Sequence, residues 1–435
     1  MKYFIQTYGC QMNVHESEKV AGVLEDYGYR CADRIEDADV IVFNTCCIRE
    51  GAETKIFSNI GNVKQLKKVK KHLIVAVLGC MTQQKKSAEN LKEKFPWIDI
   101  IIGTFNADYF ADYFKKVVKE KAKVFSLYEN EQDIVENALM YRTSGKNAWV
   151  NITYGCDNFC SYCIVPYVRG RERSRASENI VKECEQLIKD GYKTITLLGQ
   201  NVNSYGKGLK EDINFAKLCE RICALEGDFR IKFMSSHPKD FSDELINVIA
   251  SNSKMSKVVH LPCQSGSNKI LEAMNRKYTR EDYLSKIQKL KNSVPNVVLT
   301  SDFIVGFPGE SEQDFLDTCD LVKQVRYNSI FAFIYSKRRG TVAEGMPNHI
   351  DLKTKRERVN ALLEIQHAIT KEKDLELVGK SLDCLIEEKN GEIVALSESG
   401  KTVHLLKGVT NYTDKFYSVK IVKVENNKVF GEIIN

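Results

Sequence analysis

YGCDNFCSYCIVPYVRGRERSR, residues 154–175, carries three cysteines in the spacing C-x-x-x-C-x-x-C, namely Cys156, Cys160 and Cys163. The stretch directly follows a strand-like segment, NAWVNIT at 147–153. Three thiolates on one tight loop can ligate three irons of a 4Fe–4S cubane. The fourth iron then lacks a protein ligand, and such an open iron is where chemistry on a bound molecule can take place.

A zinc site or a closed ferredoxin-type cluster is the alternative interpretation of this loop. Both need a fourth protein ligand. The next cysteine, Cys184, lies within a helical pattern rather than in the loop. The spacing therefore favours an open iron–sulfur cluster.

The loop also opens a series of six strand-like segments with helical patterns such as 178–191 and 280–293 between them. Strands that alternate with helices are typical of a parallel α/β sheet. Six such units predict a partial (β/α)6 TIM-like barrel with its site at the carboxyl ends of the strands. A long charged helix at about 352–377 follows. The six segments are 147–156, 193–201, 230–238, 258–266, 297–310 and 329–337.

A second strand–helix series precedes the loop. Its strands are expected at 2–8, 39–45, 73–79 and 98–103. Their nearly continuous apolar residues predict a parallel sheet covered on both faces. The first three strands run into Cys10, Cys46 and Cys80. Because carboxyl ends of parallel strands share one edge, these thiols either hold a metal together or are three ordinary core cysteines.

The tail changes to short strands separated by turns, which predicts a small OB-like all-β barrel. Its strands are expected at 381–388, 392–398, 401–407, 416–425 and 428–434. The chain is thus an α/β protein with an N-terminal parallel α/β domain, a central barrel and a C-terminal β-barrel. The expected boundaries are 1–125, a polar linker at 126–147, then 148–371 and 372–435.

Composition and the N-terminal segment indicate the cellular location to expect. The N-terminus MKYFIQTYGC is strand-like, unlike a signal peptide, and no apolar run approaches the ~18 residues of a spanning helix. We therefore expect a cytoplasmic protein that needs no membrane, with its 14 cysteines reduced. The net charge of +6 permits a nucleic-acid partner without demanding one.

The cysteine loop and the βα series that it opens resemble the radical-SAM superfamily. The resemblance implies that the open iron binds S-adenosylmethionine (SAM), whose one-electron cleavage yields a 5′-deoxyadenosyl radical. DFIVGFPGE, with Gly306, Gly309 and Glu310, is similar to the superfamily's turn beside the adenosine. Each implied contact could instead be a polar residue that caps a strand or helix. The SAM contacts implied are Tyr162, Gln200, Asn201, Gln264, Gly306 and Glu310.

Nearly the whole chain resembles the radical-SAM methylthiotransferase family, which joins an auxiliary-cluster domain, the barrel and a small RNA-binding barrel named TRAM. The resemblance implies a second 4Fe–4S cluster on Cys10, Cys46 and Cys80, with Cys46 of the NTC motif preferred over Cys47. It covers YGCQMNVHESEKVAGVL, FNTCCIREGAETKIF, PYVRGRERSR, CQSGSNKILEAMNRKYTREDY and FIYSKRRGTVAEGMP.

Within the family these segments are most similar to the branch that methylthiolates a tRNA base, and the segment Ile48-Arg49-Glu50 distinguishes it from other branches. Two positions depart from the family pattern: Cys263, where Val is usual, and Arg339, where Pro is common.

The resemblance implies a methylthio group added to carbon 2 of isopentenyl (dimethylallyl) adenosine next to the anticodon, at tRNA position 37. SAM serves as both methyl donor and radical source. Alternatives are threonylcarbamoyl-adenosine in tRNA, an aspartate of a ribosomal protein, or a non-catalytic metal-binding RNA module. The partners implied are a tRNA anticodon stem-loop and an electron donor such as flavodoxin or ferredoxin, with the chain monomeric.

No residue is assigned as a catalytic acid or base, because carbon 2 of adenine carries a hydrogen that no base of ordinary pKa removes. Two arginines after the cysteine loop, Arg169 and Arg175, match the family pattern. Arginine can grip phosphate or pair with carboxylates. Contact with RNA or substrate and intramolecular salt bridges are therefore both open for these two residues. His237 and His260 at strand ends are expected to be structural or to line the site.

Overall fold

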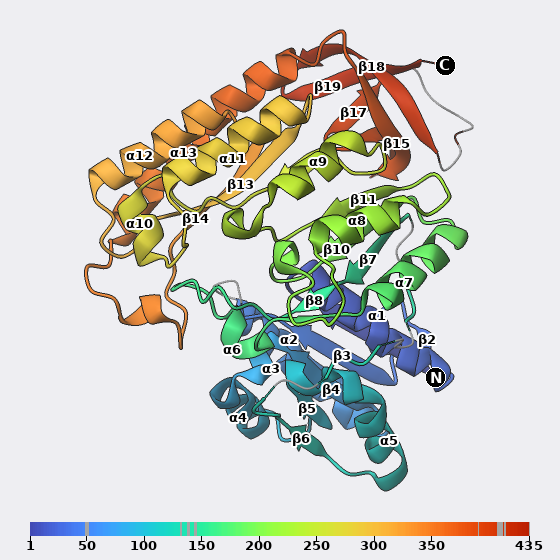
Figure 1. Ribbon diagram of the computed structural model, residues 1–435. Coiled ribbons are helices and arrows are strands. Elements are labelled where there is room, and N and C mark those ends of the chain that lie inside the picture. Colours follow the sequence, from blue (N-terminus) through green and yellow to red (C-terminus); the bar gives the residue numbers. More distant parts are fainter. Residues whose placement is uncertain are drawn as a thin grey trace.

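A computed structural model describes residues 1–47, 52–130, 133–136, 140–142, 146–389, 391–406, 412 and 415–434. The N-terminal sheet, the partial barrel and the C-terminal β-barrel follow one another from bottom to top in Figure 1. This is the predicted fold class. The discriminating segment 48–50 lies outside the described residues, and so does part of the expected linker. No described helix has both the length and the apolar character to cross a bilayer.

The N-terminal domain is a six-stranded parallel sheet in the order β2-β1-β3-β4-β5-β6. Helices α1 (Gln11–Asp26) and α5 (Phe110–Glu120) pack on one face, and α2 (Ala52–Val69) and α4 (Lys85–Lys94) pack on the other. Every residue of β3 is buried, as a strand covered on both faces requires. The strands are β1 (Lys2–Thr7), β2 (Arg30–Cys31), β3 (Val40–Thr45), β4 (Ile74–Gly79), β5 (Ile100–Ile102) and β6 (Val124–Ser126).

The four strands predicted for this domain are confirmed, whereas the two short outer strands β2 and β6 were not predicted. Each has only two or three residues. A strand this short shows no alternation of apolar and polar residues, so its place in the sheet depends on pairing with β1 or β5.

The central domain has the six predicted parallel strands, in two sheets ordered β7-β10-β11 and β12-β13-β14. An isolated parallel bridge between Ile231 and Met255 joins the two sheets just before β12. The strands are β7 (Asn147–Asn151), β10 (Thr194–Leu198), β11 (Arg230–Phe233), β12 (Val258–His260), β13 (Val298–Val305) and β14 (Ser329–Ile334). The arrangement is an open, partial barrel, as expected.

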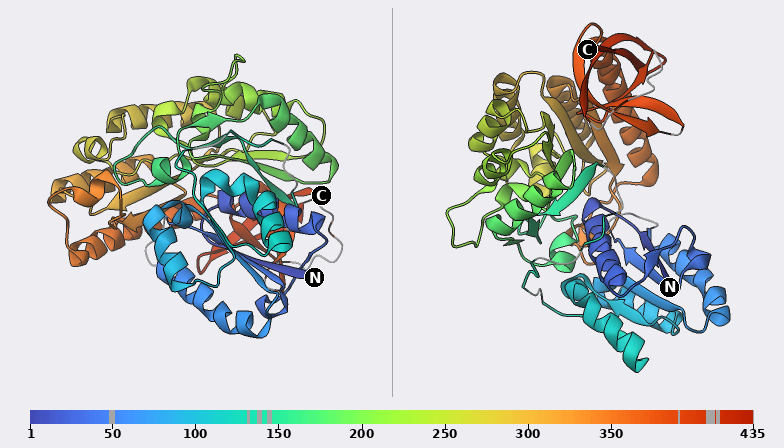
Figure 2. Two further views of the ribbon diagram at one scale, coloured as in Figure 1. Left: turned by 90° about the horizontal axis from the view of Figure 1, so that it is seen from below. Right: turned by 90° about the vertical axis from the view of Figure 1, so that its right-hand side faces the viewer.

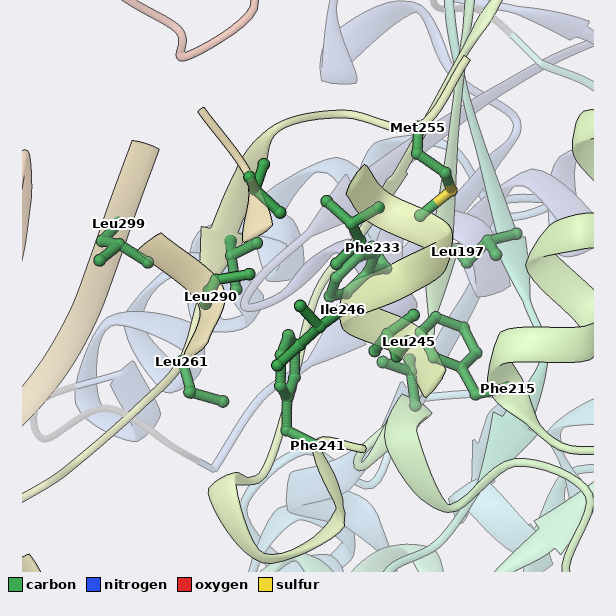
Figure 3. Close-up of a cluster of buried hydrophobic side chains, with 14 of the residues drawn as sticks. Leu197, Phe215, Phe233, Phe241, Leu245, Ile246, Met255, Leu261, Leu290 and Leu299 are labelled. Atoms are coloured by element: carbon green, nitrogen blue, oxygen red, sulfur yellow. The ribbon is translucent and has the colours of Figure 1, made fainter. Parts of the chain in front are cut away.

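Helices cover the outside of the partial barrel and form its largest core. Figure 3 shows Leu245 and Ile246 of one helix close to the strand residue Phe233. Side-chain caps start several of these helices, for example Ser242 and Ser311, each of which accepts a backbone N–H three residues on. The helices are α7 (Ser177–Lys189), α8 (Phe215–Cys223), α9 (Asp243–Ser251), α10 (Asn268–Ala273), α11 (Arg280–Ser293) and α12 (Glu312–Val325).

The long helix α13 (Leu352–Leu375) leads to a closed five-stranded barrel in the order β15-β16-β17-β19-β18. Figure 2 shows this barrel at the opposite end of the molecule from the N-terminal sheet. All five strands agree with the sequence prediction. They are β15 (Ser381–Lys389), β16 (Glu392–Ser397), β17 (Thr402–Leu405), β18 (Phe416–Glu425) and β19 (Lys428–Ile434).

Polar contacts dock the C-terminal barrel against the N-terminal ends of the central strands. The backbone N–H of Lys257 donates to the Glu398 carboxylate at 2.7 Å, and Lys232 Nζ donates to the Glu398 carbonyl at 3.1 Å. Arg230 pairs with Asp383 at 3.2 Å and lies 4.7 Å above the Phe416 ring. Glu398 therefore joins two central strands to the C-terminal domain.

The variant Glu398→Ala should weaken this docking by roughly 1.5–3 kcal/mol, because a charge-assisted hydrogen bond is lost and an N–H is left unpaired. Trypsin should then cleave faster between α13 and β15, by roughly tenfold, if cleavage follows the open population. Glu398→Gln keeps an acceptor and should restore much of the protection. Glu392→Ala removes an exposed carboxylate of the same domain and is the control; equal cleavage of all three variants would contradict the role of Glu398.

Candidate active site

The cysteine loop begins at a glycine that the backbone requires. Gly155 has φ +77°, and a Cβ at this position would lie 2.0 Å from the Arg171 carbonyl oxygen. The N–H of Cys156 donates to the Gly170 carbonyl at 3.2 Å. Any side chain at residue 155 would push the loop off the segment that follows the third cysteine.

The loop is anchored to the far side of the barrel as well. The N–H of Ser161 donates to the Met274 carbonyl at 3.1 Å, and the Ser161 hydroxyl donates to the Ala273 carbonyl at 2.7 Å. The N–H of Cys163 donates to the Cys160 carbonyl at 2.9 Å, where the chain turns into α6 (Val165–Arg169). The spacing of the three thiols is therefore set from two sides.

The N-terminal sheet presents its cysteines in a similar way. Gly9 before Cys10 and Gly79 before Cys80 also have positive φ, +105° and +111°. A Cβ on Gly9 would lie 2.7 Å from the Cys46 sulfur, and one on Gly79 would lie 2.4 Å from the Thr45 carbonyl oxygen. Glycine lets the chain turn sharply at these strand ends, so the cysteines lie at one edge of the sheet.

A single cavity of about 290 Å³ connects the two cysteine sets. Five of the six candidate cysteines line it: Cys10, Cys80, Cys156, Cys160 and Cys163. Among the described residues, no three Cys, His, Asp or Glu side chains converge as ligands of one metal ion. These cysteines therefore line a common cavity between two domains and do not surround a single metal ion.

Burial changes the acidity of these thiols. It raises the pKa of Cys156 to about 11 and that of Cys163 to about 12. A hydrogen bond with Cys47, aided by the charge of Arg169, lowers the pKa of Cys80. The two loop thiols are therefore protonated near pH 7, and a metal that binds them must displace their protons.

The structure places Arg169 inside the protein, between the two domains. Its guanidinium forms a buried ion pair with Glu16 and donates to Asn13 Oδ1 at 2.7 Å, both on α1. Arg169 also lines the cavity beside Cys80. The arginine after the barrel's cysteine loop thus holds the helix that follows Cys10.

Arg175 is buried too. It pairs with Glu136 and with Glu183, both at 2.8 Å, and donates to the Asn151 carbonyl at 2.8 Å. The sequence left two alternatives for Arg169 and Arg175, contact with RNA or substrate and intramolecular salt bridges. The structure shows salt bridges for both.

Of the six residues expected to contact SAM, the structure places three in the lining of the cavity. Tyr162, Gln200 and Gln264 line the cavity. The Gln200 side-chain oxygen accepts the Gly155 N–H at 2.5 Å, so this glutamine also supports the cysteine loop.

Asn201, Gly306 and Glu310 lie outside the described lining of the cavity. Asn201 donates to Asp240 at 2.7 Å. Glu310 accepts the Gly306 N–H at 2.9 Å and pairs with Arg358 at 2.7 Å.

The sequence analysis missed Arg276, which is buried beside the loop. It donates to the Cys160 sulfur at 3.3 Å, to the Pro262 carbonyl at 2.9 Å and to the Tyr278 hydroxyl at 2.9 Å. Arg276 follows a short helix more than a hundred residues after Cys160, so no spacing in the sequence points to it. Its charge lies where negatively charged thiolates would gather.

Three side chains that line the cavity, Gln264 among them, carry buried polar atoms with no hydrogen-bond partner among the described residues. They are His237 Nε2, Ser236 Oγ and Gln264 Oε1. Burial and the nearby Arg276 lower the pKa of His237 to about 2, so its ring is neutral. Buried polar atoms rarely stay unpaired, so a polar molecule in this cavity would find ready partners.

Loss of the Arg169–Glu16 pair should destabilise the junction of the two domains. In Arg169→Ala the Glu16 carboxylate stays buried without a partner, at a cost of about 3–5 kcal/mol, and the thermal midpoint should fall by roughly 5 °C or more. The double variant Arg169→Met with Glu16→Gln removes both charges and should recover part of the loss. Lys189→Ala breaks an exposed helical pair and should change the thermal midpoint little. If Arg169→Ala lowered the midpoint no more than this control, Arg169 would not hold the two domains together.

Comparison with known proteins agrees with this division of the chain. Residues 2–103 match the uncharacterized protein family UPF0004, and residues 150–322 match the radical SAM superfamily. The chain is also similar in fold to a radical SAM methyltransferase, TsrM, from Kitasatospora setae, solved with cobalamin and a [4Fe–4S] cluster. That likeness has a TM-score of 0.57 at 14% identity and covers 79% of this chain and 77% of that one. The likeness shows the fold alone.

Relatives much closer in sequence match the full length of the chain. A tRNA-2-methylthio-N(6)-dimethylallyladenosine synthase of Thermoanaerobacter pseudethanolicus is 48% identical over 436 residues, 99% of this chain and 92% of the relative. Proteins of the same name from Clostridium botulinum and Clostridium perfringens are also 48% identical, over 100% and 99% of this chain and 97% of each relative. The chain therefore belongs to the family of tRNA-2-methylthio-N(6)-dimethylallyladenosine synthases, within the radical SAM superfamily.

Proposed function

We propose that this chain is a radical-SAM methylthiotransferase that adds a methylthio group to carbon 2 of dimethylallyl-adenosine in tRNA, at position 37 beside the anticodon. The observation that carries the proposal is a cavity that cysteines of both domains line together. Two 4Fe–4S clusters and SAM supply the radical, the methyl group and the sulfur. The chain itself supplies position, charge and exclusion of water.

The residues present fit an iron–sulfur cluster on the barrel loop. Cys156, Cys160 and Cys163 would hold it, and their raised thiol pKa values mean that loading releases protons. Arg276, which donates to the Cys160 sulfur, would offset part of the negative charge of the thiolates. We assign the second cluster to Cys10, Cys46 and Cys80 at the edge of the N-terminal sheet.

The cavity also fits a polar cofactor such as SAM. The unpaired atoms His237 Nε2, Ser236 Oγ and Gln264 Oε1 offer hydrogen bonds to amino, carboxylate or hydroxyl groups. Because His237 Nδ1 accepts the Lys239 N–H at 3.2 Å, the neutral ring carries its proton on Nε2, which can donate without adding charge. Tyr162 and Gln200 complete the expected contacts inside the cavity, whereas Asn201, Gly306 and Glu310 would act by supporting the surrounding turns.

A second, larger cavity of about 880 Å³ suits the RNA base. It lies between the inner faces of the central strands and the C-terminal barrel. Gln11 and Met234 line both cavities, so the two are adjacent. Trp149, Phe331 and Phe416 offer aromatic surfaces for stacking, as single-stranded RNA readers use.

This aromatic cavity favours a splayed nucleotide over the aspartate of a protein substrate. Its lining balances the cations Lys146, Arg230 and Lys232 with the carboxylates Asp302, Glu387 and Glu398, so the aromatic rings rather than net charge carry this preference. The same proposal includes a monomeric protein in the cytoplasm and an electron donor of the flavodoxin or ferredoxin type.

The cleanest test of the function separates the two clusters. The triple variant of Cys10, Cys46 and Cys80 to Ala should still cleave SAM with dithionite but form no methylthio product, because the barrel loop is intact while the second cluster is lost. Cys156→Ala should block both. Anaerobic incubation with tRNA, followed by chromatography of 5′-deoxyadenosine and mass spectrometry of the nucleosides, measures both outcomes. Normal product from the triple variant would overturn the proposal.

Iron content gives an independent measure. The reconstituted protein should hold about eight irons and eight sulfides, and the triple variant of Cys156, Cys160 and Cys163 to Ala should keep about half. Full iron in that variant would contradict the assignment of the loop.

Cys46 and Cys47 can be told apart by the same measurement. The Cys46 sulfur lies against Gly9, whereas Cys47 packs with Ile164 and Val168 of the barrel domain as well as with Cys80. We expect Cys46→Ala to lose the second cluster, to about four irons, and Cys47→Ala to keep it. Iron analysis and electron paramagnetic resonance of both variants decide between the two thiols, and the reverse pattern would make Cys47 the ligand.

A further inference from the structure

The segment that follows the last barrel strand contacts both cysteine sets. It comes after β14 and includes a short 3-10 helix, η5 (Val342–Gly345). We name residues 338–343 the bridging segment. Figure 1 shows this orange part of the chain reaching from the central domain toward the N-terminal domain. None of its residues is part of the described lining of the cysteine cavity or of the larger aromatic cavity.

One end of the bridging segment reaches the N-terminal domain through Arg338. Its guanidinium donates to the backbone carbonyl of Cys47 at 3.1 Å, across 291 positions of the chain. Cys47 directly follows Cys46, a proposed ligand of the second cluster. A hydrogen bond from a charged donor is stronger than one between neutral groups. Arg338 therefore holds the backbone at the strand end that presents Cys46.

The other end reaches the cysteine loop of the barrel. The N–H of Ala343 donates to the carbonyl of Ser161 at 2.8 Å, and Ser161 lies between Cys160 and Cys163. Ala343 is buried in one cluster with Tyr335, the residue directly after β14. The bridging segment thus bonds to the backbone beside a cysteine of each set.

Internal hydrogen bonds make the bridging segment a compact turn. The Arg338 carbonyl accepts both the N–H and the hydroxyl of Thr341, at 3.1 and 2.7 Å. Thr341 is buried, and the Gly340 N–H donates to the Glu344 carboxylate at 2.9 Å. Because the backbone is fixed in this way, a movement of one cysteine set relative to the other would break the bond at one end.

We propose that Arg338 is a positioning residue that sets the place of the second cluster relative to the first, an inference that rests on the proposed function. The proposed reaction must bring a radical from the barrel loop and sulfur from the N-terminal edge to one carbon atom. Such a reaction depends strongly on distance, and a displacement of about 1 Å can cost on the order of a hundredfold in rate. Arg169 joins the domains at α1, whereas Arg338 acts on the strand end beside Cys46.

A contact that only holds the domains together is the alternative role of Arg338. Loss of such a contact would lower stability, and it would lower SAM cleavage and product formation together. Loss of a positioning residue would instead change the ratio of the two and the magnetic interaction between the two clusters. These readouts therefore separate the two roles.

The test uses the reconstituted protein with both clusters. The variants are Arg338→Ala, Arg338→Lys, which keeps a charged donor, and Thr341→Val, which removes the hydroxyl that holds the Arg338 carbonyl. Arg339→Ala removes the exposed neighbouring arginine and is the matched control. The measurements are iron content, electron paramagnetic resonance of the dithionite-reduced protein, and the ratio of 5′-deoxyadenosine to methylthio product.

We expect Arg338→Ala to keep about eight irons, because no cysteine is removed. The 5′-deoxyadenosine formed per methylthio product should rise roughly tenfold, since the radical still forms while the sulfur is displaced. The magnetic interaction between the reduced clusters depends steeply on their separation, so the resonance spectrum should change as well. Arg338→Lys should restore both readouts in part, Thr341→Val should change them less than Arg338→Ala, and Arg339→Ala should match the parent protein.

The proposal is overturned by an unchanged ratio and spectrum in Arg338→Ala, or by the same change in Arg339→Ala. A parallel fall of SAM cleavage and product with an unchanged spectrum would make Arg338 a contact that only stabilises the domains. Loss of about four irons would make Arg338 necessary for loading the cluster rather than for its position, which also contradicts the proposal.

Failure of the proposed function is seen in the parent protein and not in the variants. A parent protein that holds only about four irons contradicts the second cluster itself. A parent protein with about eight irons that makes no methylthio product contradicts the proposed reaction, while the spectrum of Arg338→Ala still decides whether Arg338 positions the cluster.

Discussion

The buried bridge from Arg169 to Glu16 and Asn13 is the contact on which the site depends. Arg169 ends the short helix after the barrel's cysteine loop, and its partners lie on the helix that follows Cys10. A buried ion pair needs good geometry to offset its desolvation, so it tolerates little sliding of one domain on the other. The bridge therefore fixes how the two cysteine sets face each other across one cavity.

The charged and neutral side chains around that cavity suit a negatively charged ligand. Arg276 and Arg169 bring buried cations to the loop cysteines and to Cys80. Burial keeps the thiols of Cys156 and Cys163 protonated in the absence of metal, and burial together with Arg276 keeps the His237 ring neutral. Iron–sulfur clusters with thiolate ligands carry negative charge, so the arginines stabilise the loaded site rather than the empty one.

Each of the three domains borders a cavity at a defined edge. The strand ends of the N-terminal sheet and of the barrel converge on the cysteine cavity, as carboxyl ends of parallel strands do. The C-terminal barrel, held by Glu398 and Asp383, closes one side of the larger aromatic cavity.

The sequence by itself determined the secondary structure around the site, because spacing, strand pattern and glycine–cysteine pairs act locally. The loop from Cys156 to Cys163, the strand ends at Cys10, Cys46 and Cys80, and all six barrel strands could be predicted in this way. Only the tertiary structure decided that Arg169 and Arg175 lie in buried ion pairs, that Arg276 reaches Cys160 and that Glu310 lies outside the cavity. These contacts join residues far apart in the chain, and whether an arginine meets a phosphate or a carboxylate depends on which domain packs against it.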